Sequence, residues 1–147
     1  MPRLEGPHHT VDIEWDKGGK PIQYVTGKGK VDHIRDALAA IALAVKMIEE
    51  SEFHHVCAVY NLLEVTHIPH LARFVGSGRI HSTPRTAHIV MATHDKTLQL
   101  VGRLIAVSNN RRLRTTDICT SVEEIEAAVQ RWWNLPDRTR EYTVDNK

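Results

Sequence analysis

Several features that would quickly indicate the class of this protein are scarce in its sequence. Only two cysteines occur, aromatic residues make up 5% of the 147 residues, and the formal net charge is +1. Cys57 and Cys119 both lie in apolar runs, where a thiol usually behaves as a small hydrophobic group, so we expect a reduced, cytoplasmic protein. The balanced charge argues against the broad basic surface that non-specific nucleic-acid binding requires. No nucleic-acid partner is therefore expected.

Long apolar runs are also missing. No window approaches the roughly 18 consecutive apolar residues of a membrane span. Residues 1–10 lack the apolar stretch of a signal peptide. We therefore expect no membrane span and no export.

What the sequence does contain is enough apolar material for one core. With 41% hydrophobic residues, a chain of this length can fold without disulfides or metal. We expect a single domain over residues 1–147, with a flexible N-terminus over about residues 1–10. A polar tail over about residues 135–147 is expected to fray.

The first half of the chain predicts a hairpin followed by a long helix. Apolar and polar residues alternate over 11–15, and a second strand is expected over 22–26 after a polar turn. Gly27–Lys30 should end that strand. From Val31 to Glu50 apolar residues recur in steps of three and four, which is one face of a helix. Its apolar surface is broad, so it is either packed between sheet and helix or shared in a homodimer.

The second half predicts alternating strands and helices. Runs of apolar residues over 56–63 and 87–92 are typical of parallel strands covered on both faces. A helix should start at Pro69, turn Leu71, Phe74 and Val75 inward, and end at Gly76–Gly78. Further expected elements are a helix capped by Asp95, a strand over 113–119, and a helix that starts with a capping box at Ser121 and ends near Trp133.

Histidines suggest one candidate site. His67 and His70 lie where a central strand gives way to a helix, the edge where α/β proteins place working residues. A metal site would need three or four converging ligands. The sequence has no H-E-x-x-H or C-x-x-C pattern, so we expect no metal and no cofactor. A metal-dependent enzyme using both histidines remains the third interpretation.

Covalent or phosphate chemistry finds little support in the remaining motifs. Ser77, Ser82 and Cys57 are the candidate nucleophiles, and none has a recognisable activating neighbour. Gly76, Ser77, Gly78 and Arg79 could hold an anion through backbone N–H groups and a guanidinium, as Gly27–Lys30 could, but neither is a P-loop. The basic cluster over 111–114 indicates either a solvated edge strand or a surface for an anionic partner.

The order of elements over residues 11–133 resembles the STAS superfamily, the sulfate-transporter and anti-sigma-factor-antagonist domains, including the SpoIIAA-like group. The local matches are Ala58–Leu71, a central strand running into a helix, and Thr120–Ala128, a last strand running into an acidic helix. This resemblance implies an α/β fold, with a mixed sheet of about five strands and about four helices packed mostly on one face. The implied order is β-β-α-β-α-β-α-β-α.

The chain departs from that family where its phosphorylation switch would lie. Antagonist members carry an aspartate on the strand and a phosphorylatable serine at the following helix start, which a kinase-like anti-sigma factor modifies. Here Asn61 stands in place of the aspartate, and Pro69–Leu71 occupies the serine region, so the switch is expected to be absent. The resemblance still implies a binding surface, formed by the turn around Thr66–His70 and the helix after it.

We therefore predict a non-catalytic regulatory or protein-interaction domain with a protein partner, and with a homodimer as a further expectation. The alternative is a small-ligand binder for a lipid or an anion, because some STAS-like domains resemble the SEC14-type lipid-binding fold. The expected binding residues lie along the strand end and the next helix: Thr66, His67, Pro69, His70, Arg73, Gly76, Ser77, Gly78 and Arg79. No catalytic residue is expected.

Overall fold

The computed structural model describes residues 2–83, 85–109 and 115–135. The expectations for the basic cluster over 111–114 and for most of the tail fall outside the described residues. Within the described residues, no helix combines the length and the apolar character needed to cross a bilayer.

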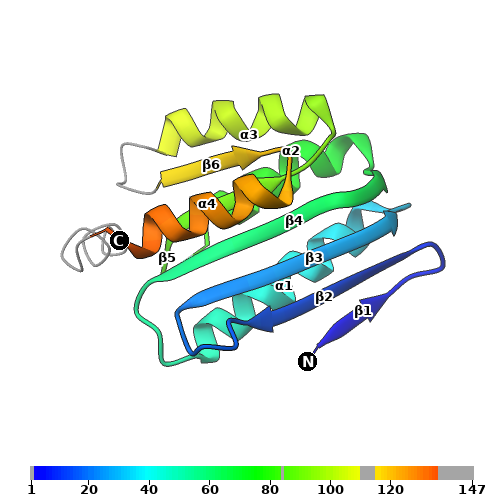
Figure 1. Ribbon diagram of the computed structural model, residues 1–147. Coiled ribbons are helices and arrows are strands. Elements are labelled where there is room, and N and C mark those ends of the chain that lie inside the picture. Colours follow the sequence, from blue (N-terminus) through cyan, green and yellow to red (C-terminus); the bar gives the residue numbers. More distant parts are fainter. Residues whose placement is uncertain (1, 84, 110–114, 136–147) are drawn as a thin grey trace.

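A mixed sheet with the strand order β1-β2-β3-β4-β5-β6 forms the centre of the molecule (Figure 1). The strands are β1 (Arg3–Glu5), β2 (His9–Trp15), β3 (Ile22–Lys30), β4 (Val56–His67), β5 (Thr86–Ala92) and β6 (Thr115–Cys119). Strands β1 to β3 pair antiparallel, and β3 to β6 pair parallel. The predicted α/β fold and its element order are confirmed.

The sheet has one strand more than expected, because β1 lies in the N-terminal segment for which no element was predicted. Its three residues are too few to show a two-residue period. It pairs with β2 through the register Leu4↔Val11, and Leu4 packs against the core. An ion pair between Arg3 and Asp12, 2.6 Å from Nε to Oδ1, joins the same two strands.

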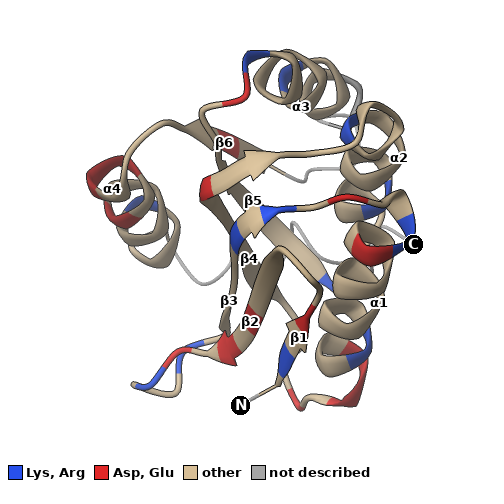
Figure 2. Cartoon of the chain, turned by 90° about the vertical axis from the view of Figure 1, so that its right-hand side faces the viewer, with Lys and Arg blue, Asp and Glu red and all other residues tan. Residues whose placement is uncertain are grey.

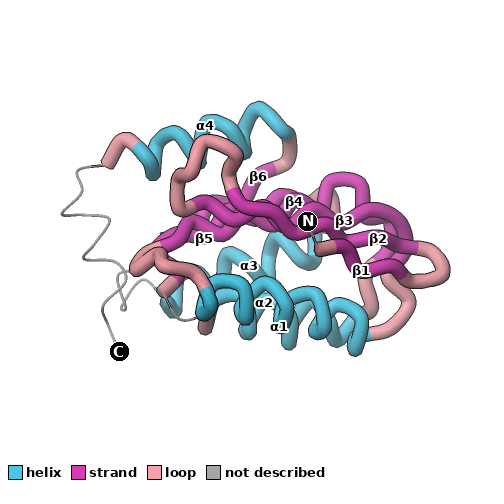
Figure 3. The backbone as a smooth tube through the Cα atoms, turned by 90° about the horizontal axis from the view of Figure 1, so that it is seen from below, coloured by secondary structure: helices cyan, strands magenta, loops and turns pink. Residues whose placement is uncertain are grey.

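Four helices cover the sheet unequally. They are α1 (Ile34–Glu50), α2 (His70–His81), α3 (Lys96–Asn109) and α4 (Val122–Trp133). Figure 3 shows α1, α2 and α3 in one layer against one face, and α4 alone on the other. The buried apolar residues form two clusters that match these layers, one containing Ala44 and Ile89, the other Val59 and Trp132. The prediction that most helices share one face is confirmed.

The prediction that Gly27–Lys30 ends a strand is wrong, because β3 continues through Lys30. Gly29 adopts φ +90°, and a Cβ there would overlap the carbonyl oxygen of His8. The pairing with β4 shifts register twice here, between Thr26 and Lys28 and between Gly29 and Lys30. The glycines therefore mark an irregular strand and a close backbone approach, as glycine in a strand often does.

The second helix also differs from its prediction. It runs to His81 and does not end at Gly76–Gly78. Gly76 is buried, and a Cβ there would lie 3.5 Å from Ile41 Cδ1, an ordinary van der Waals contact, so α2 lies close to α1 at this position. The expected inward residues Leu71, Phe74 and Val75 point outward instead, with exposures of 63%, 47% and 38%. The helix packs mainly through Ala72, Gly76 and Ser77, with Ile80 and His81 buried in its last turn.

The predicted caps of the last two helices form with one adjustment. Asp95 Oδ1 accepts from the N–H of Leu98 at 2.8 Å, which caps α3. Ser121 Oγ accepts from the N–H of Glu124 at 3.1 Å. The Glu124 carboxylate reaches back to the N–H of Thr120 at 2.6 Å, one residue earlier than in a standard capping box.

Candidate functional site

The predicted site lies at an overhanging strand end. Pairing between β4 and β5 stops at Asn61↔Ala92, whereas β4 continues beside β3 as far as His67. The carbonyl of His67 accepts from the N–H of Val31 at 3.0 Å, which ties this end to the segment before α1. The turn to α2 therefore sits at the carboxyl edge of the parallel strands, the edge where α/β folds bind ligands and partners.

The predicted residues divide into an outer and an inner group. Thr66, His67, His70 and Arg79 are exposed. Pro69 occupies the cap position before α2 and is half-buried. Gly76 and Ser77 face the core. The nine residues thus do not form one cluster, because a helix divides them between its two sides.

Arg73 is held by another helix. Its Nε and Nη2 donate to Asp95 Oδ2 at 3.0 and 2.8 Å, in a partly buried pair. The Arg73 hydrogen bonds are the main cause that holds the pKa of Asp95 below its ordinary value, and the Leu98 N–H adds to it. Because Asp95 also caps α3, this pair fixes α2 against the start of α3. Arg73 therefore serves the packing of the helices.

The anion-binding interpretation of Gly76–Arg79 does not fit the geometry. These residues lie inside α2, where backbone N–H groups serve the helix. Gly27–Lys30 likewise lies inside β3. Neither segment forms an open loop of N–H groups that would hold a phosphate.

The histidines and nucleophiles show no built catalytic or metal constellation in the described part of the chain. No group of three His, Cys, Asp or Glu residues among the described residues could hold a metal ion. His70 stacks against Phe74, with ring centroids 5.5 Å apart. Cys57 is fully buried, and burial raises its pKa strongly. Ser82 Oγ donates to the Gly78 carbonyl at 2.8 Å. The metal-enzyme interpretation gains no support.

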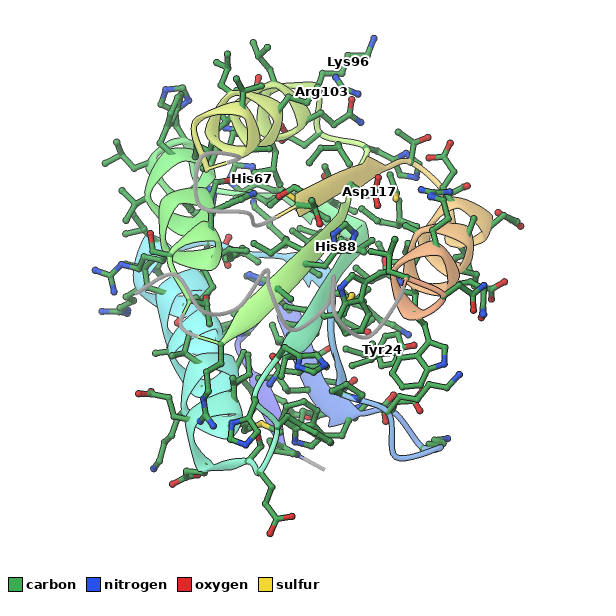
Figure 4. The ribbon with its side chains drawn as sticks, turned by 90° about the vertical axis from the view of Figure 1, so that its left-hand side faces the viewer. Tyr24, His67, His88, Lys96, Arg103 and Asp117 are labelled. Carbon is green, nitrogen blue, oxygen red and sulfur yellow. The ribbon has the colours of Figure 1, made fainter. Side chains whose placement is uncertain are left out.

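A cluster that the sequence analysis did not single out links β5, β6 and α4. His88 is buried, with its Nδ1 2.5 Å from Thr115 Oγ1 and its Nε2 2.9 Å from Asp117 Oδ2 (Figure 4). Arg131 lies 3.5 Å from the other oxygen of Asp117. The His88 hydrogen bond is the main cause that lowers the pKa of Asp117. The cluster lies at the amino ends of the parallel strands, so it stabilises the sheet edge away from the predicted site.

Exposed apolar side chains gather on two neighbouring helices. Of the eight large hydrophobic residues that are exposed in the described ranges, six lie on α2 and α3. They form one stripe on each helix: Leu71, Phe74, Val75, Leu100, Leu104 and Val107. We call these six residues, together with the exposed basic residues Arg79, Lys96 and Arg103 of the same helices, the α2–α3 face. Sequence periodicity missed this face because it assigned large apolar residues to the core.

The charge of the same two helices has one sign. Neither α2 nor α3 contains an aspartate or a glutamate. Arg79, Lys96 and Arg103 are exposed on them, and Figure 4 shows the last two extending from α3. Lys96 and Arg103 follow the spacing of the apolar stripe, because Lys96 lies four residues before Leu100 and Arg103 lies three after Leu100 and four before Val107. Figure 2 shows the contrast with α4, which carries a cluster of acidic residues. The α2–α3 face is therefore both apolar and basic.

Comparison with known proteins identifies the architecture. No protein-family model matches the sequence, and no curated protein matches it. A crystal structure of an uncharacterized protein of the DUF3478 family from Shewanella loihica PV-4, described as having a SpoIIAA-like fold, is similar with a TM-score of 0.53. The similarity covers 85% of this chain and 97% of that chain. The chain has a SpoIIAA-like fold.

The SpoIIAA-like fold confirms the resemblance at the level of architecture. Sequence identity with the Shewanella loihica protein is 12%. A shared fold at this identity does not transfer a function, because function depends on the particular residues of a site. The roles of Thr66–His70 and of α2 thus rest on the geometry of this chain.

Proposed function

We propose that this SpoIIAA-like protein is a non-catalytic, cytoplasmic regulatory domain that binds a partner protein through the α2–α3 face. The observation that carries the proposal is the exposure of six large apolar side chains on two adjacent helices. Leu71, Leu104 and Val107 are each more than 60% exposed. Exposed apolar side chains gathered on neighbouring elements and bordered by polar residues are typical of protein interaction sites.

The chemistry of the face specifies the partner. Arg79, Lys96 and Arg103 border the apolar stripes, and no acidic side chain on α2 or α3 offsets them. A partner helix with apolar residues at steps of three and four, flanked by aspartate or glutamate, matches both properties. The partner segment is therefore an acidic amphipathic helix.

Residues at the start of α2 support a binding role without a phosphorylation switch. Pro69, His70 and Leu71 stand where the family's antagonist members carry the modified serine. His70 is exposed and stacks on Phe74. The turn therefore adds an aromatic edge to the α2–α3 face, and association here does not depend on a serine phosphate.

Selection from a displayed library of random helical peptides tests this proposal. We expect the native protein to enrich acidic amphipathic sequences. Phe74→Ser should weaken the selected peptides at least tenfold, because a central aromatic anchor is lost. The matched control is Val122→Ser on α4, since Val122 is 50% exposed but lies on the other side of the sheet.

Two results would overturn the proposal. One is selection of peptides with no acidic amphipathic pattern. The other is equal binding of the selected peptides to the native protein and to Phe74→Ser. Circular dichroism and thermal unfolding of both variants check that the changes leave the fold intact.

A further inference from the structure

An apolar cavity lies between the sheet and the layer of helices α1 to α3. Its walls come from several elements, including Val25 of β3, Ala40 of α1 and Leu98 of α3. The cavity has a volume of about 80 Å³.

Small side chains on the two helices create this space. Ala37 and Ala40 of α1 line the cavity opposite Ala72 and Gly76 of α2. Interior positions of this kind usually carry larger residues that fill the core to high density. Leu71, Phe74 and Val75 of α2 point outward instead, as described above. The cavity thus lies on the inner side of α2, where its residues are small, and the α2–α3 face lies on the outer side, where they are large.

Ser77 places an unpartnered hydroxyl in the cavity wall. Its side chain is 1% exposed, and its Oγ has no hydrogen-bond partner among the described residues. Two hydroxyls just after the end of the same helix behave differently: Ser82 donates to the Gly78 carbonyl at 2.8 Å, and Thr83 to the Ile80 carbonyl at 2.9 Å. A buried hydroxyl without a partner costs free energy, so a ligand that supplies the partner binds favourably.

Tyr60 adds a second hydroxyl to the same wall. It lines the cavity from β4 and is 3% exposed. No hydrogen bond to its hydroxyl occurs within the described part of the chain, and burial alone raises its pKa. Its neutral O–H is therefore available as a donor inside the molecule.

We propose that this cavity binds a small neutral molecule with an apolar body and one oxygen that hydrogen-bonds to Ser77 or Tyr60. None of the described residues that line the cavity is acidic or basic, so a charged ligand would lose its hydration without compensation. A medium-length alcohol, ester or ketone fits the size and the chemistry. Leu62 and Val65 line the cavity and are only half-buried, which places the entrance beside the overhanging end of β4.

Titration of the ¹⁵N-labelled protein with 1-octanol tests the site. We expect saturable changes in the ¹H–¹⁵N spectrum at residues of β4 and α2 that line the cavity. Octanoate has the same chain length but carries a charge at neutral pH, so it should bind at least tenfold more weakly. Absence of saturable changes with octanol, or equal binding of octanoate, would overturn the proposal.

Variants then locate the ligand. Ala72→Leu should fill the cavity and reduce octanol affinity at least tenfold, with Ala40→Leu as a second filling variant. Ala127→Leu is the matched control, because Ala127 is exposed on α4. Ser77→Ala should weaken octanol at least threefold and leave benzene, which needs no hydroxyl, unchanged. Native octanol affinity in a folded filling variant would contradict the cavity as the site.

This proposal stands apart from the proposed function. The octanol site uses the inner side of α2, whereas peptide binding uses the outer side. Saturable octanol binding by the native protein without selection of acidic amphipathic peptides would show that the proposed function has failed and the cavity site has not. Selection of such peptides without saturable octanol binding would show the reverse.

Discussion

At the scale of single residues, the assignment of a side chain depends on what it touches. The sequence places Arg73 among the expected binding residues, yet Asp95 engages it in a bidentate pair. Ser77 looked like part of a turn, yet it is buried in a helix with an unsatisfied Oγ. The sequence shows which residue stands at each position, but it does not predict the hydrogen-bond partner of either side chain.

The Arg73–Asp95 pair predicts a specific acid sensitivity. The pKa of Asp95 is lower in the folded protein than its ordinary value of 3.8, so its contribution to stability is present above that value. The contribution is lost as pH falls through the lower, folded pKa. Asp95→Asn should lower stability at pH 7 by about 1 kcal/mol and should reduce the loss of stability below about pH 4.

Urea unfolding of native protein and Asp95→Asn at pH 7, 4 and 3 measures this effect. Glu126→Gln, an exposed change on α4, is the control. An unchanged acid dependence in Asp95→Asn would show that the pair does not form.

Ser77 gives a second prediction at this scale. Ser77→Ala removes a buried hydroxyl that has no partner, so the unliganded variant should be more stable than the native protein by about 1–2 kcal/mol. The higher helix propensity of alanine accounts for only about 0.5 kcal/mol of that gain. Chemical denaturation measures the difference. A loss of stability would indicate that the hydroxyl is satisfied in solution.

At the scale of elements, β3 shows why glycine patterns mislead. Gly27–Lys30 has the composition of a loop, and yet it forms the second half of a strand. The backbone of β3 needs a positive φ at Gly29 and the close approach of His8. Glycine serves that need equally in a strand or a turn, so composition alone does not distinguish them.

Two glycines with similar backbone angles test this explanation. Gly19 has φ +83° with open space around its Cβ position, whereas a Cβ at Gly29 would overlap the backbone of His8. Gly19→Ala should cost about 1 kcal/mol from backbone strain alone. Gly29→Ala should cost at least 2 kcal/mol more than Gly19→Ala, roughly the scale of a buried steric clash. Equal losses in urea unfolding would contradict the role given to the His8 contact.

The helix α2 marks the limit of what periodicity predicts. Its start after Pro69 follows from the sequence, but its inward side does not. Ala72, Gly76 and Ser77 face the core because they allow close packing on α1, while Leu71 and Phe74 remain outside. A hydrophobic pattern predicts that the stripe with the largest apolar residues faces the core, whereas on this helix that stripe is exposed.

At the scale of the whole molecule, sequence predicted the architecture better than the site. The order of strands and helices has strong local signals such as the buried runs of β4 and β5, and the SpoIIAA-like fold follows from them. The α2–α3 face and the cavity depend on how two helices settle on the sheet, which is a tertiary property. Both were therefore visible only in the folded chain.

Site-specific photo-crosslinking in cells tests the central claim most directly. A photoreactive phenylalanine analogue at position 104 of α3 should capture a discrete protein, and the crosslinked peptide should be an acidic amphipathic segment. The same analogue at position 122 of α4 is the control and should not capture that protein. Capture of the same protein from both positions, or a crosslinked peptide without acidic residues, would contradict partner binding by the α2–α3 face.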